Sequence, residues 1–294
     1  MAVNQPLASP SPPKLTVSYH ESNWTPEYNI PPSKVWTLQP GLKHEPSTDI
    51  FPTLGNRIID DEVKWGNDID FRGEFIYTPG YWEWAEDVLN LFRKPLREGM
   101  IYDAVFASLF TYDRNVDIVQ AFCEAWCPRT NTLITSSGEM SISLRDLYML
   151  GGLPLLGDIY DERIPNALDL NKSTIRPETF NMTCRMARGI KVCLAPLVLA
   201  SIYYGLNSIL ESFSPGQIGT PFPIHYVYGW LAAYFNTHFK TPSLMLLSPK
   251  MVTSSGEGGA KHYDKIDARK RIFKGEHASW LCTSRQNGRD ILFL

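Results

Sequence analysis

The sequence lacks the roughly 20 consecutive apolar residues that a helix needs to cross a bilayer, so no membrane association is expected. It also lacks an excess of either charge, since 28 Lys and Arg against 31 Asp and Glu give a net charge of -3. Nothing global therefore indicates a nucleic-acid or membrane-surface binder. The opening residues, MAVNQPLASPSPP, have neither a basic start nor an apolar stretch. A secretory signal is therefore not expected.

Cysteine is scarce, and the five cysteines are an odd number. Together with the expected lack of an export signal, this favours reduced thiols in the cytosol or nucleus. Cys123 and Cys127 are four residues apart on a predicted helix, hence about 40° apart around its axis. They suggest a metal site only weakly, because Cys184 and Cys193 supply no suitable second pair. Small buried hydrophobes are the preferred interpretation.

Motifs that carry catalysis are also missing. The sequence contains no HExxH, no GxSxG and no glycine-rich phosphate loop. We therefore assign no catalytic residue, no cofactor and no metal ligand. A cryptic enzyme with a carboxylate-bound metal stays as an alternative. Its candidate acidic clusters are Asp60, Asp61 and Glu62; Asp68 and Asp70; and Asp158, Asp161 and Glu162.

Proline concentrates at the start of the chain, where residues 1–52 hold ten of the 22 prolines and show no hydrophobic period. Residues 1–74 are therefore predicted to form a Pro-rich, extended N-terminal arm. The arm contains Trp24, Tyr28 and Trp36, apolar residues that a simple spacer does not need. We therefore expect the arm to be partly docked against the rest of the protein.

Helical periodicity begins near residue 78. Thr78 and Pro79 are typical of a helix start, and they predict a helix over 79–92. Apolar rows predict a second helix over 101–110 and a third from Asn115 through Trp126, which must end before Pro128.

The next segment changes period. Residues 132–135 and 140–143 are short β-type runs separated by turn residues, and they predict a small β-hairpin over about 132–143. Ser143 and Asp146 then form a capping-box pattern for a helix that ends at Gly151 and Gly152.

Two strongly apolar helices are predicted over 191–210 and 224–239. The first contains Pro196 and is too short to span a membrane, so it is expected to be a buried core helix. The predicted fold class is therefore mainly α: a multi-helix bundle with a small β-hairpin and an extended N-terminal arm. Its core is predicted to span 75–247.

The last segment, residues 248–294, is basic and contains glycine, with nine basic and five acidic residues. It holds the basic cluster Lys265, Arg269, Lys270, Arg271 and Lys274. This cluster is a candidate nucleic-acid or nuclear-import contact. The favoured alternative is the solvated face of a helix.

The segment TSSGE occurs twice, at 135–139 and at 253–257. Because the flanking residues differ completely, we interpret it as repeated turn chemistry and not as an internal repeat.

Residues 122–158, FCEAWCPRTNTLITSSGEMSISLRDLYMLGGLPLLGD, carry a family pattern. They resemble the plant mobile domain, the module of the maintenance-of-meristems-like proteins, which is also labelled "aminotransferase-like". The later segments 194–206 and 225–239 look like further helices of that family. The resemblance thus covers about residues 75–275. The residues that match its pattern are Trp126, Gly138, Glu139, Leu144, Asp146, Gly152, Leu153 and Pro154.

The resemblance implies a non-enzymatic nuclear protein involved in meristem maintenance, transposon silencing and genome integrity. It implies nuclear protein partners, among them phosphatase-like or chromatin factors, and it transfers no active-site residue. The "aminotransferase-like" label finds no support, because no cofactor-binding pattern is present. The alternative is a transposon-derived nucleic-acid-binding protein that uses the basic C-terminal segment.

Overall fold

The computed structural model describes residues 53–66, 70–71, 79–136, 138–160, 179–218, 222–242, 248–274, 285–286 and 289–290. The chain divides into two units, Met1–Asp49 and Ile50–Leu294, and every described residue belongs to the second. Of the arm predicted over 1–74, residues 1–52 and their expected docking lie outside the described residues, whereas residues 54–59 form a helix that was not predicted.

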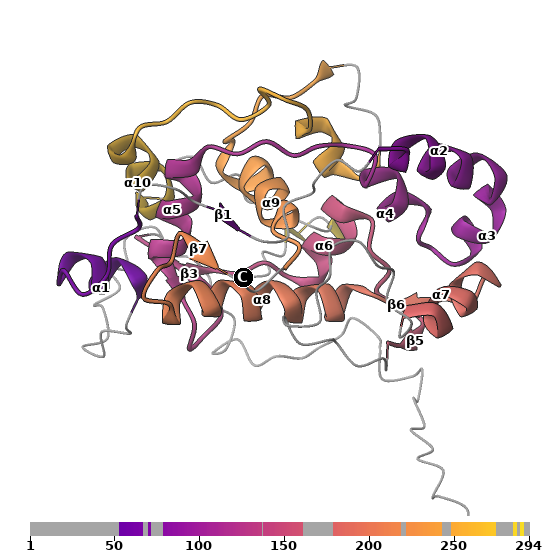
Figure 1. The fold of residues 1–294 in the computed structure, drawn as a ribbon, viewed down its shortest axis with the longest axis horizontal. Helices are drawn as coiled ribbons and strands as arrows, with labels where there is room; N and C mark the ends of the chain where they lie inside the picture. Colours follow the sequence, from indigo (N-terminus) through magenta and orange to yellow (C-terminus); the bar gives the residue numbers. More distant parts are fainter. Residues whose placement is uncertain are drawn as a thin grey trace, which may run out of the picture. The chain divides into compact units, whose positions relative to one another are not determined.

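The architecture is mainly α-helical, as predicted (Figure 1). The helices of the described residues are α1 (Leu54–Ile59), α2 (Tyr81–Leu91), α3 (Arg93–Glu98), α4 (Tyr102–Ala107), α5 (Val116–Ala125), α6 (Leu144–Gly151), α7 (Thr179–Ala187), α8 (Ala195–Glu211), α9 (His225–Phe235), the 3-10 helix η5 (Lys250–Ser254) and α10 (Lys265–Lys274).

The strands of the described residues are short and form four small sheets. β2 (Trp126–Cys127), β3 (Thr132–Thr135) and β4 (Gly138–Met140) make an antiparallel sheet in the order β2-β3-β4. The remaining sheets are two-stranded: β1 (Asp70–Phe71) with β7 (Gln217–Ile218) and β5 (Asp158–Ile159) with β6 (Val192–Cys193), both parallel, and β8 (Arg285–Gln286) with β9 (Arg289–Asp290), antiparallel.

The start of the helical region differs from the prediction. Thr78 lies outside the described residues, and Pro79 lies in a turn that ends at Gly80, whose φ of 80° is left-handed. Helix α2 therefore begins at Tyr81 and not at residue 79. The predicted helix over 101–110 is shorter, because α4 ends at Ala107, where the Ser108 hydroxyl donates to the Val105 carbonyl at 2.6 Å. Helix α3 was not predicted.

Helix α5 begins as predicted, since the Asn115 side chain accepts a hydrogen bond from the Ile118 N–H at 2.9 Å. It ends at Ala125, and Trp126 and Cys127 pair with β3 as strand β2. The prediction that Cys123 and Cys127 share one helical face is therefore wrong. Both cysteines are buried, as expected of small hydrophobes.

The predicted hairpin is confirmed as β3 and β4, but its second strand covers Gly138–Met140 and not 140–143. The capping box is also confirmed. The Asp146 N–H donates to the Ser143 hydroxyl at 3.2 Å, and the Ser143 N–H donates to the Asp146 carboxylate at 2.8 Å. Helix α6 ends at Gly151, and Gly152 follows in a left-handed conformation with φ 70°.

The two apolar helices are present but shorter than predicted. Helix α8 begins at Ala195 because Val192 and Cys193 pair with β5, which places Pro196 in the first turn instead of the interior. Helix α9 ends at Phe235, where Asn236 adopts a left-handed φ of 52°. No helix of the described residues is long and apolar enough to cross a membrane.

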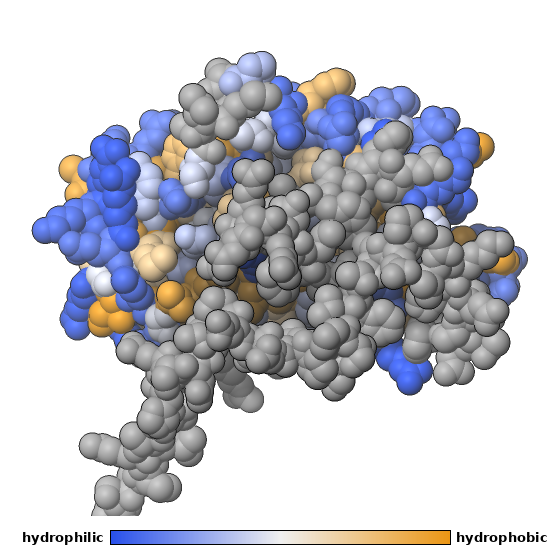
Figure 2. Space-filling view, turned by 180° about the vertical axis from the view of Figure 1, so that it is seen from behind, coloured by the Kyte–Doolittle hydropathy of each residue, from blue (hydrophilic) through white to orange (hydrophobic). Residues whose placement is uncertain are grey.

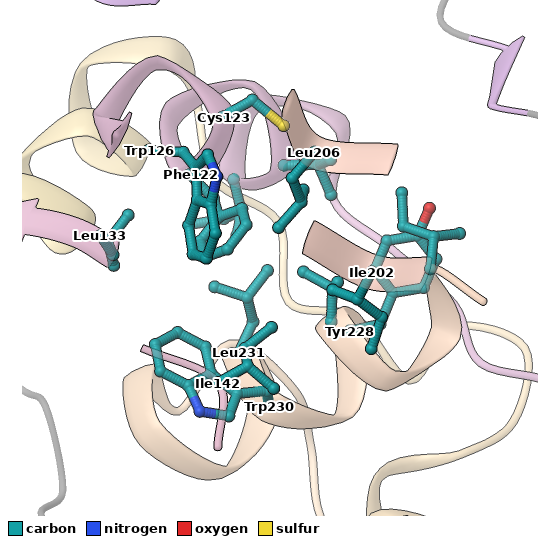
Figure 3. Packing of buried hydrophobic residues seen from close by; sticks show 14 of the residues in the cluster. Phe122, Cys123, Trp126, Leu133, Ile142, Ile202, Leu206, Tyr228, Trp230 and Leu231 are labelled. Carbon is teal, nitrogen blue, oxygen red and sulfur yellow. The ribbon is translucent and has the colours of Figure 1, made fainter. Parts of the chain in front are cut away.

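The main hydrophobic core joins helices α5, α8 and α9 to strand β3 (Figure 3). Phe122 and Trp126 lie against Trp230, Leu231 and Leu206 in this core. It also takes in residues outside the predicted span of 75–247, which are Leu54, Val63 and Trp65 on one side and Met251, Ala268 and Ile272 on the other. One core therefore draws on all three predicted segments.

Gly152 is the tightest of the capping glycines. A Cβ added there would lie 2.6 Å from the Asp103 Cβ and 2.9 Å from the Ala104 nitrogen, whereas a Cβ at Gly80 would meet nothing within 4 Å. Both glycines have left-handed φ angles, 70° and 80°. An alanine would thus cause similar backbone strain at the two sites, but a clash only at Gly152.

We expect Gly152→Ala to lower the free energy of unfolding by about 2 kcal/mol more than Gly80→Ala does. Urea denaturation of the two variants beside the wild type measures this difference. Equal losses would show that α6 does not pack closely on α4 at this glycine.

Candidate functional site

Helix α10 carries the five basic residues singled out in the sequence. It packs against α5 by burying Ala268 and Ile272 completely. A basic segment is thereby fixed on the main core.

Arg269 binds the buried carboxylate of Glu124 from α5. Its Nε and Nη2 atoms donate to Oε2 at 2.8 Å and to Oε1 at 2.9 Å. The Glu124 side chain is only 4% exposed, whereas that of Arg269 is 46% exposed. These hydrogen bonds raise the pKa of the Arg269 guanidinium above its usual range. Arg269 is thus engaged with the protein itself.

A third donor completes the environment of Glu124. The Trp65 Nε1 donates to Glu124 Oε1 at 3.0 Å. Trp65 is itself buried and comes from the segment after α1. A buried carboxylate is stable only when its oxygens are hydrogen-bonded. Glu124 therefore connects the residues after α1, helix α5 and helix α10.

The other basic residues divide into two groups. The Arg271 Nη1 donates to the Phe235 carbonyl at 2.9 Å, and its guanidinium lies 4.9 Å from the centroid of the Tyr263 ring. Lys265, Lys270 and Lys274 are exposed, and Lys270 lies 3.9 Å from Asp267. The predicted cluster therefore consists of two arginines that hold the fold and three exposed lysines.

Asp146, a residue of the family pattern, forms a second internal network. Besides capping α6, its Oδ1 accepts a hydrogen bond from the Tyr234 hydroxyl of α9 at 2.5 Å. Burial raises the pKa of Tyr234 above its usual range, and the hydrogen bond to Asp146 raises it further. Asp146 thus ties α6 to α9.

Three further residues of the pattern also join helices. Trp126 is buried, and its Nε1 donates to the Asn207 side chain of α8 at 3.0 Å. Leu153 is buried, and the Pro154 carbonyl accepts from the Ala195 N–H at 3.2 Å, where α8 begins. The pattern therefore describes how α5, α6 and α8 are joined.

The groups weighed for chemistry are not brought together in the described part of the chain. No group of three His, Cys, Asp or Glu that could hold a metal ion occurs among its residues. Burial, with adjacent Glu124 as the lesser cause, raises the pKa of the Cys123 thiol, so its thiolate is disfavoured. Among the acidic clusters, Asp61 pairs with Lys64 at 3.0 Å and Asp158 pairs with Arg185. Asp68, Asp161 and Glu162 lie outside the described residues.

Residues 100–161 match the family model of the plant mobile domain. No curated protein and no solved structure matches the chain. Within the plant mobile domain segment lie α4, α5, the β2-β3-β4 sheet, α6 and β5. The resemblance suggested by the sequence is therefore confirmed over this segment.

The contacts of two residues in or near the plant mobile domain segment were not predicted from the sequence. Glu124 had a detectable signal, because it is the single acidic residue within the apolar run 118–127. His225 had none. Its imidazole stacks on Tyr112 and Tyr226, with ring centroids 5.9 Å and 4.3 Å away.

Burial lowers the pKa of His225 to about 4. Its buried Nδ1 has no hydrogen-bond partner among the described residues. Because the folded-state pKa lies below the usual 6.5, the folded state is disfavoured once the unfolded chain takes up the proton. Stability is therefore fully present above about pH 6.5 and falls as the pH drops toward 4.

We expect the free energy of unfolding to be about 2 kcal/mol lower at pH 5 than at pH 7.5 through His225 alone. His238, whose pKa burial also lowers, adds to the slope in the same direction. His225→Phe should remove its share of the slope, and the same exchange at exposed His262 should retain the wild-type slope. Urea titrations at several pH values measure this, and an unchanged slope in His225→Phe would contradict it.

Proposed function

We propose that this protein is a non-enzymatic, nuclear protein-interaction module that acts in meristem maintenance, transposon silencing and genome integrity. The match of residues 100–161 to the plant mobile domain carries the proposal. Its partners are nuclear proteins, among them phosphatase-like or chromatin factors. The use of Trp126, Asp146 and Gly152 in joining helices supports a scaffold function for this segment.

The surface agrees with protein contacts but does not single out one site. Large apolar side chains are exposed on several elements, such as Trp84 and Leu91 of α2 and Phe213 after α8. Figure 2 shows hydrophobic residues lying among hydrophilic ones on the coloured part of one face. Isolated apolar residues of this kind are normal on protein surfaces.

The second candidate is nucleic-acid binding through α10. The observation that favours it is the exposure of Lys265, Lys270 and Lys274 on one helix. Nucleic-acid binding is the weaker candidate, because Arg269 binds Glu124 and Arg271 binds the Phe235 carbonyl. Three lysines are few for phosphate contacts.

We expect the full-length protein, expressed in plant cells as a fusion with a proximity-labelling ligase, to enter the nucleus and to label chromatin or phosphatase-like proteins. Gly152→Ala, which weakens the contact of α6 with α4, should reduce this labelling, and Gly80→Ala serves as the matched control. Exclusion from the nucleus, or labelling equal to that of a free nuclear ligase, would contradict the proposal.

The rival function has its own signature. Retention on DNA or RNA that falls with salt, and that is lost in a Lys265→Ala, Lys270→Ala, Lys274→Ala variant, would favour nucleic-acid binding over the protein-interaction module. A triple alanine variant of the exposed lysines Lys64, Lys94 and Lys250 serves as the charge-matched control.

A further inference from the structure

The two TSSGE segments have the same sequence but different environments. In the first, Ser136 is exposed in the turn between β3 and β4. In the second, Ser254 and Ser255 at the end of η5 are only 5% and 8% exposed. An enzyme that acts on this sequence can therefore reach the first copy in the folded protein and not the second.

Ser136 also holds the C-terminal end of α10. Its N–H donates to the Phe273 carbonyl at 2.7 Å, and its hydroxyl donates to the Lys274 carbonyl at 3.0 Å. The last carbonyls of a helix have no partner within the helix, so these two bonds satisfy groups that would otherwise face water. The hairpin thus caps α10.

An acidic residue stands three positions after Ser136. Glu139 is exposed on β4, and its Oε2 accepts a hydrogen bond from the Thr132 hydroxyl at 2.8 Å. A carboxylate three residues after a serine is the feature that acid-directed serine kinases bind with basic side chains. In the second copy, Glu257 has the same spacing from buried Ser254.

The same spacing of serine and acid occurs elsewhere in the described residues, but on helices. Ser143 caps α6 and contacts Asp146, and Ser208 lies inside α8, where its hydroxyl donates to the Tyr204 carbonyl. A kinase binds its substrate as an extended segment, which a helix does not offer. Ser136 lies in a turn and outside any helix.

We propose that Ser136 is a phosphorylation site for an acid-directed serine kinase and that its phosphorylation releases the C-terminal end of α10. The kinase transfers the γ-phosphoryl group of ATP to the Ser136 Oγ. The Oγ–H bond and the bond from the γ-phosphorus to the bridging oxygen break, an Oγ–P bond forms, ADP leaves, and the proton goes to the base of the kinase.

The release follows from the contacts of Ser136. A phosphoester oxygen has no proton to donate, so the bond to the Lys274 carbonyl is lost. The phosphate brings close to two negative charges to the negative end of the α10 dipole, where they repel the Phe273 and Lys274 carbonyls. The first turns of α10 stay in place, because Ala268 and Ile272 are buried and Arg269 binds Glu124.

Incubating the folded full-length protein with ATP and a purified acid-directed serine kinase tests the site. Mass-spectrometric mapping should find phosphate on Ser136 at least about tenfold faster than on Ser254. Two synthetic peptides spanning residues 130–142 and 248–260 should be modified at similar rates. Equal modification of Ser136 and Ser254 in the folded protein, or of the 130–142 peptide alone with none on Ser136 in the protein, would overturn the site.

Glu139→Gln supplies the recognition control, because glutamine still accepts from Thr132 but carries no charge. This variant should lose most of the Ser136 modification, whereas Glu257→Gln should leave it unchanged. Equal effects of the two substitutions would show that Glu139 does not direct the kinase.

Hydrogen exchange of the phosphorylated and unmodified protein tests the release. Amides of Phe273 and Lys274 should exchange roughly five- to tenfold faster after phosphorylation, which corresponds to the loss of one hydrogen bond. Amides of α5 and of buried Ile272 should not change. Unchanged exchange in Phe273 and Lys274 would overturn the release of α10.

Discussion

The buried carboxylate of Glu124 is the constraint on which the arrangement of the fold depends. It lies on α5 beside Phe122 and Cys123, where burying a charge is costly unless the charge is paired and hydrogen-bonded. Its partners come from distant parts of the chain: Trp65 from the segment after α1 and Arg269 from α10. Satisfying one carboxylate therefore fixes the two ends of the described core against its central helix.

In the plant mobile domain segment, too, single side chains join several elements. Asp146 caps its own helix and accepts from Tyr234 of α9, and Trp126 combines burial with a hydrogen bond to Asn207 of α8. Asp146 and Trp126 are thus used to orient helices. This arrangement supports the interaction module proposed above.

The sequence predicted those features whose partners lie close along the chain. The Asn115 cap and the Ser143–Asp146 capping box were found because donor and acceptor are three residues apart. The starts of α2 and α8 and the end of α5 were misplaced. Two of these three errors involve strand pairing, of Cys193 with Ile159 and of Trp126 with Leu133, which a helical period does not reveal.

The candidate site was predicted less well for the same reason. The basic run of α10 was visible in the sequence, but the partner of Arg269 is 145 residues away. Without that partner, an arginine that supports the core looks the same as one that awaits a ligand. His225 lies in a segment that was predicted as an apolar helix, but its contact with Tyr112, which is distant along the chain, carried no signal.

A double-mutant cycle on Glu124 and Arg269 tests directly whether this ion pair holds α10 to the core. Glu124→Gln, Arg269→Met and the double variant are compared with the wild type by urea denaturation. We expect the double variant to be more stable than the sum of the single losses implies, with a coupling of about 2 kcal/mol, because each single change leaves a polar group without its partner. Losses that add within about 0.5 kcal/mol would show that the pair does not hold α10 to the core.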